Sequence, residues 1–452
     1  MKIPTPQNTE VEATEYEAYY VEETGRFVYR VPNPPHPSRP FKSVDKSQMK
    51  SRLAGFNYMT KGVNGMRSEV DLQIEDIIEQ HSVDYMGPLA GHRAGFFPLH
   101  NRHILVTEDA MPMQPVPYSL EEDPDGECWM LVYDFLQALL PDPQFDYFVG
   151  WLKVGYEALL TGKFRPGQIL ALAGKSGVGK TFFQNLITLI FGRVAKPFMY
   201  LSGGTTFNSE LFAAEHLLIG DELGSADYMA RRNLGNKLKQ LVAEPMHKYH
   251  AKGIDAFDLY PFWRCSMSFN YDAENVTVLP PMEESLREKM MIFYCHDSFV
   301  SVPDEWREDV WNSPWEVSLK DQLPYFLYWL TQIDIPDHLK HRRYGVVSYQ
   351  DPEVLSHLSK AEMEDDFWDI VTGCLFEDTA DLNQKEWLIS STELQAIILR
   401  KRPHLGNTKG MLQASNACGI QLRKIADKGD GRVCHVSRST WKLCRVAENL
   451  WK

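Results

Sequence analysis

The fold of this chain is decided by the stretch Gly174-Lys175-Ser176-Gly177-Val178-Gly179-Lys180-Thr181, which follows an apolar run at 169–173 and precedes a helix-like segment. Its glycines let the backbone turn tightly, so that successive N–H groups point at a triphosphate. The helix that follows adds its positive N-terminal end. We expect Lys180 to reach the β- and γ-phosphates of ATP, and the Thr181 hydroxyl to bind Mg²⁺. The alternative is an ordinary Gly-rich turn, but the flanking strand and helix favour a phosphate-binding loop.

Composition limits the remaining possibilities. The 452 residues suggest about three domains, and 44% hydrophobic with 24% charged residues is ordinary globular composition. No apolar run is long enough for a membrane span, and the start Met1–Glu10 lacks a basic and then apolar signal region. The seven cysteines form no CxxC pair, which favours reduced thiols over a zinc module. We therefore expect a cytoplasmic protein.

Charge is divided unevenly along the chain. The net charge is −14, and the opening segment clusters glutamates between Glu10 and Glu23. The tail from 386 to 452 instead carries 12 Lys or Arg residues against 5 Asp or Glu residues. Such asymmetry is typical of a chain with one end that faces nucleic acid. The alternative is a solvated basic face without a partner.

Three regions are predicted, and the fold class is α/β. Residues 1–125 carry short strand patterns and a helix-like stretch at 69–81, and are expected to form an α+β accessory or assembly domain. Residues 126–340 open with aromatic helical stripes and continue with alternating strands and helices, the pattern of an α/β nucleotide-binding core. Residues 341–452 contain the end of a helical connector (303–360) and a compact basic domain.

Two acids follow the next predicted strand. The run His216-Leu217-Leu218-Ile219-Gly220 ends in Asp221 and Glu222. Asp221 is expected to hold Mg²⁺ through water, while Glu222 orients and deprotonates the attacking water. Strands often end in acids, but the position downstream of a phosphate loop favours a hydrolytic pair.

A third strand, 262–270, ends in Asn270, which we expect to lie between the acids and the γ-phosphate. The alternative is an Asn that caps a turn. Seventeen residues later, Arg287 precedes an apolar strand. Phosphoryl transfer gains from an added guanidinium, often donated by a neighbouring subunit. Arg287 is therefore the candidate arginine finger, with Arg264 and Lys289 as rivals.

Between these strands, residues 246–258 read as a hairpin with its turn near Gly253. The first strand is basic and aromatic and carries Lys248, His250 and Lys252. Positive side chains on a hairpin suit contact with a nucleic-acid backbone. A solvated surface hairpin is the alternative.

These elements in order resemble superfamily 3 helicases of the AAA+ class. The stretches 237–242 and 260–262 are similar to the primase-associated helicases of phages, poxviruses and mobile elements. The resemblance covers residues 125–340, with no recognisable primase domain before it. It differs in one place: the family has a proline close after the sensor asparagine, whereas Pro280 and Pro281 come ten residues after Asn270.

The resemblance implies an ATP-dependent DNA helicase or translocase that acts in phage or mobile-element replication. It implies a homo-oligomeric ring, a hexamer, that hydrolyses ATP with Mg²⁺ at subunit interfaces. Single-stranded or forked DNA would be the substrate, with a separate primase or polymerase as a further partner. The implied roles are phosphate binding by Gly174, Ser176, Gly177, Val178, Gly179 and Lys180, metal binding by Thr181 and Asp221, hydrolysis by Glu222, sensing by Asn270, trans catalysis by Arg287 and DNA contact by the Lys252 tip.

The C-terminal segment is consistent with this picture. A capped helix is predicted from Ser390 and a second from Gly410 to Ile425, followed by two short strands around the turn at Gly429–Gly431. Helices followed by a β-ribbon suggest a winged-helix-like DNA-binding domain. Its expected backbone contacts are Arg423, Lys424, Lys428 and Arg432. A purely structural helical cap is the alternative.

Two other functions remain open. A AAA+ ATPase that loads or remodels another protein, such as a helicase loader or a defence NTPase, would use the same triphosphate site. A small-molecule kinase would also use the loop, but it would explain neither the Asp221–Glu222 pair nor the basic hairpin and tail.

Overall fold

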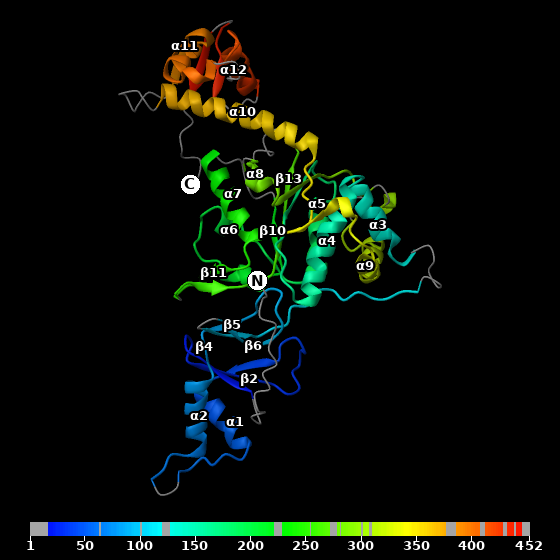
Figure 1. Ribbon diagram of the computed structural model, residues 1–452, viewed down its shortest axis with the longest axis vertical. Helices are drawn as coiled ribbons and strands as arrows, with labels where there is room; N and C mark the ends of the chain where they lie inside the picture. Colours follow the sequence, from blue (N-terminus) through cyan, green and yellow to red (C-terminus); the bar gives the residue numbers. More distant parts are fainter. Residues whose placement is uncertain are drawn as a thin grey trace.

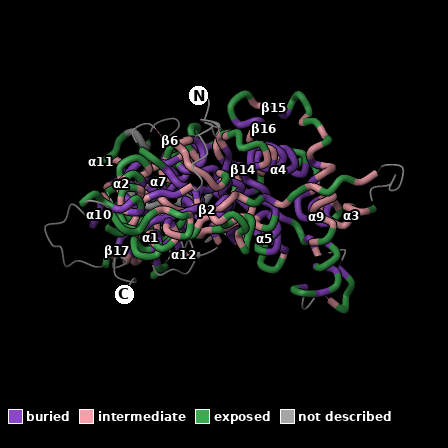
Figure 2. Tube along the Cα trace, turned by 90° about the horizontal axis from the view of Figure 1, so that it is seen from below, coloured by how far each residue is buried: buried purple, intermediate pink, exposed green. Residues whose placement is uncertain are grey.

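The computed structural model describes residues 17–62, 65–99, 102–119, 127–220, 228–253, 255–271, 278–280, 282–299, 302–306, 310–376, 386–406, 412–427, 432–437 and 440–444. The chain is elongated, with a central α/β core between an N-terminal and a C-terminal part (Figure 1). Buried segments gather in the core around α4, α9 and β14 (Figure 2). No helix in these described ranges is both long and apolar enough to cross a membrane.

The core is built on a five-stranded sheet with the order β14-β8-β13-β10-β9. The strands are β8 (Ile169–Gly174), β9 (Val194–Ala195), β10 (His216–Ile219), β13 (Arg264–Asn270) and β14 (Met290–Tyr294), and all of their pairings are parallel. β13 therefore lies between the strand that leads into the phosphate loop and the strand that leads to the predicted acids. Their carboxyl ends share one edge of the sheet, where ligands of open α/β sheets bind.

Helices cover both faces of this sheet because its central strands are apolar on both sides. One face packs on α3 (Glu127–Leu139), α4 (Gln144–Thr161), α5 (Lys180–Phe191) and α9 (Pro314–Gln332), with Leu170 and Leu172 of β8 facing them. The alternate residues Ile169 and Ala171 face α7 (Tyr228–Ala243). Each buried Leu or Phe contributes about 1.5–3 kcal/mol relative to exposure, so this alternation fixes the register. α9, predicted as part of a connector, is instead a core helix.

The N-terminal part contains two small sheets. One has the order β3-β2-β1-β4 and consists of β1 (Ala18–Val21), β2 (Arg26–Arg30), β3 (Phe41–Val44) and β4 (Ser82–Val83). It packs on α1 (Lys46–Gly55) and α2 (Glu69–Gln80), the helix predicted at 69–81. The other sheet has the order β5-β7-β6, with β5 (Tyr85–Gly87), β6 (Gly95–Leu99) and β7 (Arg102–Val106). Tyr85 and Ile104 of this sheet belong to the core cluster of the central sheet, so the two parts pack together.

The loop after β5 fastens the N-terminal part to the core. Ala90 N–H donates to Phe212 O at 2.7 Å, and Phe262 N–H donates to Ala90 O at 2.9 Å. Gly91 N–H donates to Glu215 Oε1 at 3.1 Å. Glu215 is fully buried and pairs with the partly exposed Arg193 through Nη2 at 2.6 Å, so the contact includes an ion pair with a buried carboxylate. These bonds lie at the amino ends of β10 and β13.

The C-terminal part consists of α10 (Pro352–Leu375), α11 (Ser391–Lys401), α12 (Ala417–Asp427) and a sheet with the order β17-β19-β18. The strands are β17 (Glu386–Ser390), β18 (Val433–His435) and β19 (Thr440–Cys444). Ser390 caps α11 by accepting from Glu393 N–H at 3.1 Å, as predicted. α12 begins at Ala417, because 412–416 are not helical, so the predicted start at Gly410 is wrong.

α10 joins the two parts. Val354 and Leu358 near its start belong to the core cluster of the central sheet, whereas Phe367 and Val371 belong to the C-terminal cluster. One helix therefore connects the carboxyl edge of the central sheet with the C-terminal part (Figure 1).

Candidate functional site

The phosphate loop has the backbone that its sequence predicts. It connects β8 directly to α5, and it reaches φ values of 84° at Gly177 and 105° at Gly179. Residues with a Cβ rarely adopt these values, so the glycines are required by the conformation. The helix N-terminus at Lys180 adds a partial positive charge at the end of the loop. This backbone is suited to bind phosphate.

Lys180 and Asn270 meet at this loop. Lys180 Nζ donates to Gly174 O and Lys175 O at 2.7 Å each, and to Asn270 Oδ1 at 3.3 Å. The contact follows from the sheet register, because Asn270 of β13 lies opposite Gly174 of β8. These hydrogen bonds hold the Lys180 ammonium at the loop. Asn270 therefore lies beside the phosphate loop.

A pocket of about 210 Å³ opens over the loop. Its polar side chains come from three elements: Ser176 of the loop, Lys180 and Thr181 of α5, and Ser268 and Asn270 of β13. The sequence did not single out Ser268, but its position two residues before Asn270 places both on one face of the strand. Three aromatic residues complete the wall: Phe182, Phe299 and Trp311.

The segment after β14 packs against the phosphate loop and is hydrogen-bonded to it. Cys295 N–H donates to Ala173 O at 2.6 Å, and Ser298 Oγ donates to Val178 O at 2.8 Å. A Cβ on Gly179 would lie 2.2 Å from Ser298 Oγ. Burial raises the pKa of the Cys295 thiol to about 12, so this side chain is neutral. The loop is thus fixed by packing as well as by its own turns.

The predicted acids Asp221 and Glu222 lie outside the described residues. The strand before them, β10, ends at Ile219 and pairs with β13, with Ile219 opposite Met267. Thr181 lines the pocket, and a hydroxyl oxygen together with a carboxylate belongs to the oxygen donors that suit Mg²⁺. Among the described residues, no cluster of three His, Cys, Asp or Glu side chains could hold a metal.

A buried polar network joins α5, β10 and β13 next to the pocket. Gln184 Nε2 of α5 donates to Ser266 Oγ at 2.9 Å and to Ile219 O at 3.2 Å. The ring nitrogens of His216 lie 2.8 Å from Ser266 Oγ and 2.7 Å from Thr188 Oγ1. Burial lowers the pKa of His216 to about 3, so the ring is neutral. The network ties the phosphate-loop helix to β10 and β13 without a buried charge.

The three candidate arginine-finger residues lie in different surroundings. Arg287 is exposed in the short helix α8 (Glu284–Arg287), just before β14, and its Nε donates to Met282 O at 3.1 Å. Ile169 N–H donates to Lys289 O, so Arg287 and Lys289 lie at the amino end of the sheet. Six residues of β8 separate them from the loop, about 20 Å in a strand. Arg264 is the first residue of β13 and is only 2% exposed, so it cannot reach another subunit.

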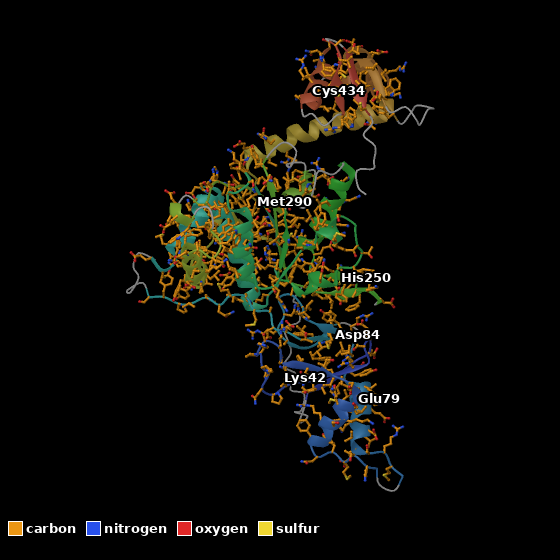
Figure 3. All side chains as sticks on the ribbon, turned by 180° about the vertical axis from the view of Figure 1, so that it is seen from behind. Lys42, Glu79, Asp84, His250, Met290 and Cys434 are labelled. Carbon is orange, nitrogen blue, oxygen red and sulfur yellow. The ribbon has the colours of Figure 1, made fainter. Side chains whose placement is uncertain are left out.

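The predicted hairpin consists of β11 (His247–Tyr249) and β12 (Phe257–Leu259). Lys252 is exposed at its turn, and the Lys248 side chain is 72% exposed with an ion pair to Asp258 at 3.5 Å. His250 is half-buried, and its ring contacts Phe207. Figure 3 shows His250 between the core and the N-terminal part, in which Asp84 is labelled. The lysines are therefore available to a partner.

The rest of the hairpin is packed rather than free. The Tyr249 ring contacts Tyr85 of β5 and Phe212 of the core, each at 5.2 Å between ring centroids. Burial lowers the pKa of His247 to about 4. Asn208 joins the hairpin to the preceding loop, because its side chain donates to Lys248 O and accepts from His250 N–H at 2.8 Å each. Tyr249 therefore packs the hairpin onto β5 and the core.

The basic residues of the C-terminal part separate into two groups. Arg423 and Lys424 are exposed on α12. The Arg432 guanidinium lies over the Trp368 ring at 5.7 Å, so it contacts α10. The predicted contact Lys428 lies outside the described residues.

The comparisons with known proteins agree with this fold. The model of a family of unknown function (DUF5906) matches residues 172–285, well under half of the chain. No curated protein matches the sequence. The chain is similar to the apo structure of the NrS-1 C-terminal region, with 13% identity, 95% of this chain and 96% of that chain covered, and a TM-score of 0.50. At this identity the likeness shows the fold alone.

Two further solved structures are more distant. The chain is similar at 10% identity to SCCmec type IV Cch, described as an active helicase, with a TM-score of 0.30 and coverage of 91% and 72% of the two chains. It is similar at 12% identity to JCV helicase in complex with a small molecule, with a TM-score of 0.30 and coverage of 55% and 64%. At these TM-scores neither likeness supports an inference about this chain.

Proposed function

We propose that this chain is an ATP-hydrolysing motor that moves along DNA, a helicase or translocase of the superfamily 3, AAA+ type. The observation that carries the proposal is the contact of Lys180 Nζ with Asn270 Oδ1 at the phosphate loop. It brings a phosphate-binding cation next to a polar side chain of the neighbouring strand, at the edge to which the strand of Asp221 and Glu222 also leads. Such an arrangement suits hydrolysis of a triphosphate by positioned water.

In the proposed reaction, water attacks the γ-phosphorus, the bond to the bridging oxygen breaks, and ADP and phosphate leave. Glu222 takes the proton of the water, and Asn270 orients that water. Lys180 neutralises charge on the transferred group. Thr181 and Asp221 would hold Mg²⁺, which neutralises phosphate charge when bound.

The position of Arg287 supports catalysis between subunits. It lies at the amino end of the sheet, about 20 Å in strand length from the loop of its own chain, so it cannot reach its own triphosphate. An exposed guanidinium at that end is available to a neighbouring copy. We therefore propose a homo-oligomeric ring, a hexamer, in which each Arg287 completes the next site.

The exposed basic residues support DNA as the polymer along which the protein moves. Lys248 and Lys252 are exposed on a hairpin that packs against the amino ends of β10 and β13, the strands whose other ends approach the pocket. Changes at the pocket can therefore reach the hairpin along two strands. The C-terminal order of helix, strand, two helices and two strands, with Arg423 and Lys424 exposed, suits a winged-helix-like DNA contact.

DNA-stimulated ATPase activity tests the proposal. We expect single-stranded DNA to raise the steady-state rate of phosphate release, and Lys252→Ala to remove that stimulation while the basal rate stays unchanged. Lys340→Ala is the matched control, because Lys340 is an exposed lysine on another two-stranded hairpin, β15 (Lys340–His341) with β16 (Gly345–Val346). Identical rates with and without DNA would contradict the proposal and favour a AAA+ ATPase that remodels another protein.

A further inference from the structure

The pocket over the phosphate loop is lined by both polar and aromatic side chains. The polar ones include Lys180, Thr181 and Asn270, whose chemistry suits phosphate and metal. The aromatic ones are Phe182, Phe299 and Trp311. Because the same pocket includes both, a ligand with its phosphates on the loop lies within reach of an aromatic ring. An aromatic surface is not needed to bind phosphate, so it requires its own explanation.

Trp311 is the exposed member of this group. Its side chain is 46% exposed, although it lies beside the nearly buried Phe182 with 5.2 Å between ring centroids. Phe182 is itself fixed between Phe135 and Trp315, at 5.3 and 5.8 Å. One side of the Trp311 ring is therefore supported by a rigid aromatic cluster, and another side is open. An exposed indole at the rim of a pocket is typical of a binding surface.

The backbone of Trp311 is also fixed. Asn312 has a φ of 64°, and its N–H donates to Glu316 Oε2. Ser313 caps α9 by accepting from Glu316 N–H at 3.1 Å. Glu316 is 1% exposed and pairs with Lys320 at 2.7 Å. The helix cap thus holds the indole in position before a ligand arrives, which lowers the cost of binding.

We propose that Trp311 stacks on the base of the bound nucleotide and supplies its affinity for a nucleoside triphosphate over plain polyphosphate. This inference rests on the proposed triphosphate site and names the residue that recognises the nucleoside. Stacking is tolerant of base identity because every base has an aromatic face. Stacking on the indole therefore does not by itself discriminate ATP from GTP.

Calorimetric titration of Mg²⁺–ATP, Mg²⁺–GTP and inorganic tripolyphosphate into the full chain tests this. We expect Trp311→Ala to weaken ATP and GTP binding by about tenfold, the loss of one aromatic–base contact, and to leave tripolyphosphate binding unchanged. Trp311→Phe should restore most of the affinity. Val317→Ala is the matched control, because Val317 is 50% exposed on the neighbouring α9 and does not line the pocket.

Three results would overturn the inference. Unchanged ATP binding in Trp311→Ala means that the indole does not touch the base. An equal loss for ATP and tripolyphosphate means that Trp311 only supports the loop. If the wild-type chain binds neither ligand, the triphosphate site itself is wrong, and the failure belongs to the proposed function.

Discussion

Replacing Gly179 by alanine tests the geometry of the phosphate loop more sharply than removing Lys180. The new Cβ would meet two obstacles: a φ of 105°, and Ser298 Oγ at 2.2 Å. Gly177→Ala isolates the first, because Gly177 has a φ of 84° but no atom within 4 Å of an added Cβ. The pair of variants therefore separates backbone strain from overlap.

The expected magnitudes follow from these contacts. Backbone strain of about 1–2 kcal/mol makes the binding-competent loop a minor conformation and weakens ATP binding by about 5- to 30-fold in Gly177→Ala. In Gly179→Ala the Ser298 hydroxyl must also move, which breaks its bond to Val178 O and adds about 2 kcal/mol. The total loss should exceed about 100-fold.

A second substitution gives the decisive control. Ser298→Ala removes the overlapping oxygen but not the lost hydrogen bond, so the double variant Gly179→Ala with Ser298→Ala should regain about fivefold in affinity over Gly179→Ala. Ser298→Ala alone should lose about fivefold, the value of one hydrogen bond. Isothermal titration with Mg²⁺–ATP measures all four. Equal losses in Gly177→Ala and Gly179→Ala, with no recovery in the double variant, would refute the packing of the loop on the segment after β14.

Three further outcomes are expected. Asn270→Ala should bind ATP normally and release phosphate about 10²–10³ times more slowly, because a positioned polar group is lost; a normal steady-state rate would exclude its role. Glu215→Gln should lower the urea-measured free energy of unfolding by about 1–3 kcal/mol, because the fully buried carboxylate that accepts from Gly91 N–H and from Arg193 loses its charge and one acceptor oxygen. Glu386→Gln, in the exposed pair with Lys442, should cost about 0–1 kcal/mol. Similar costs for Glu215→Gln and Glu386→Gln would contradict the importance of the buried Glu215 contact. The third concerns His216, whose pKa is about 3 in the folded chain and about 6.5 when unfolded. Between those values only the unfolded state binds the proton, so stability falls on acidification, by about 2 kcal/mol from pH 7 to pH 5. His216→Gln should remove that part of the pH dependence, and an unchanged slope would contradict the buried neutral ring.

The central site was predictable because its chemistry is local. The phosphate loop is eight consecutive residues, and Asn270 directly ends an apolar strand, so spacing alone brought both to one sheet edge. The hairpin was predictable from its turn near Gly253 and its alternation. Asp221 and Glu222 stay predictions, since they lie outside the described residues.

Other features depend on contacts between distant segments. The strand order, with β13 between β8 and β10, cannot be read from the order along the chain. The support of Gly179 by Ser298 joins residues 119 positions apart, and the Tyr85–Tyr249 contact joins the N-terminal sheet to the hairpin. α9 was misread as part of a connector because the surroundings of Trp315 and Leu319, which bury its apolar face against α3 and α5, are not visible in its own sequence.

Unwinding of a forked duplex DNA tests the central claim most directly. With Mg²⁺ and ATP, the wild-type chain should displace the labelled strand, while Lys180→Ala, which loses the phosphate-binding cation, should leave the duplex intact. An ATPase-active wild-type chain that displaces no strand and hydrolyses ATP at the same rate without DNA would contradict the account of a DNA-moving motor.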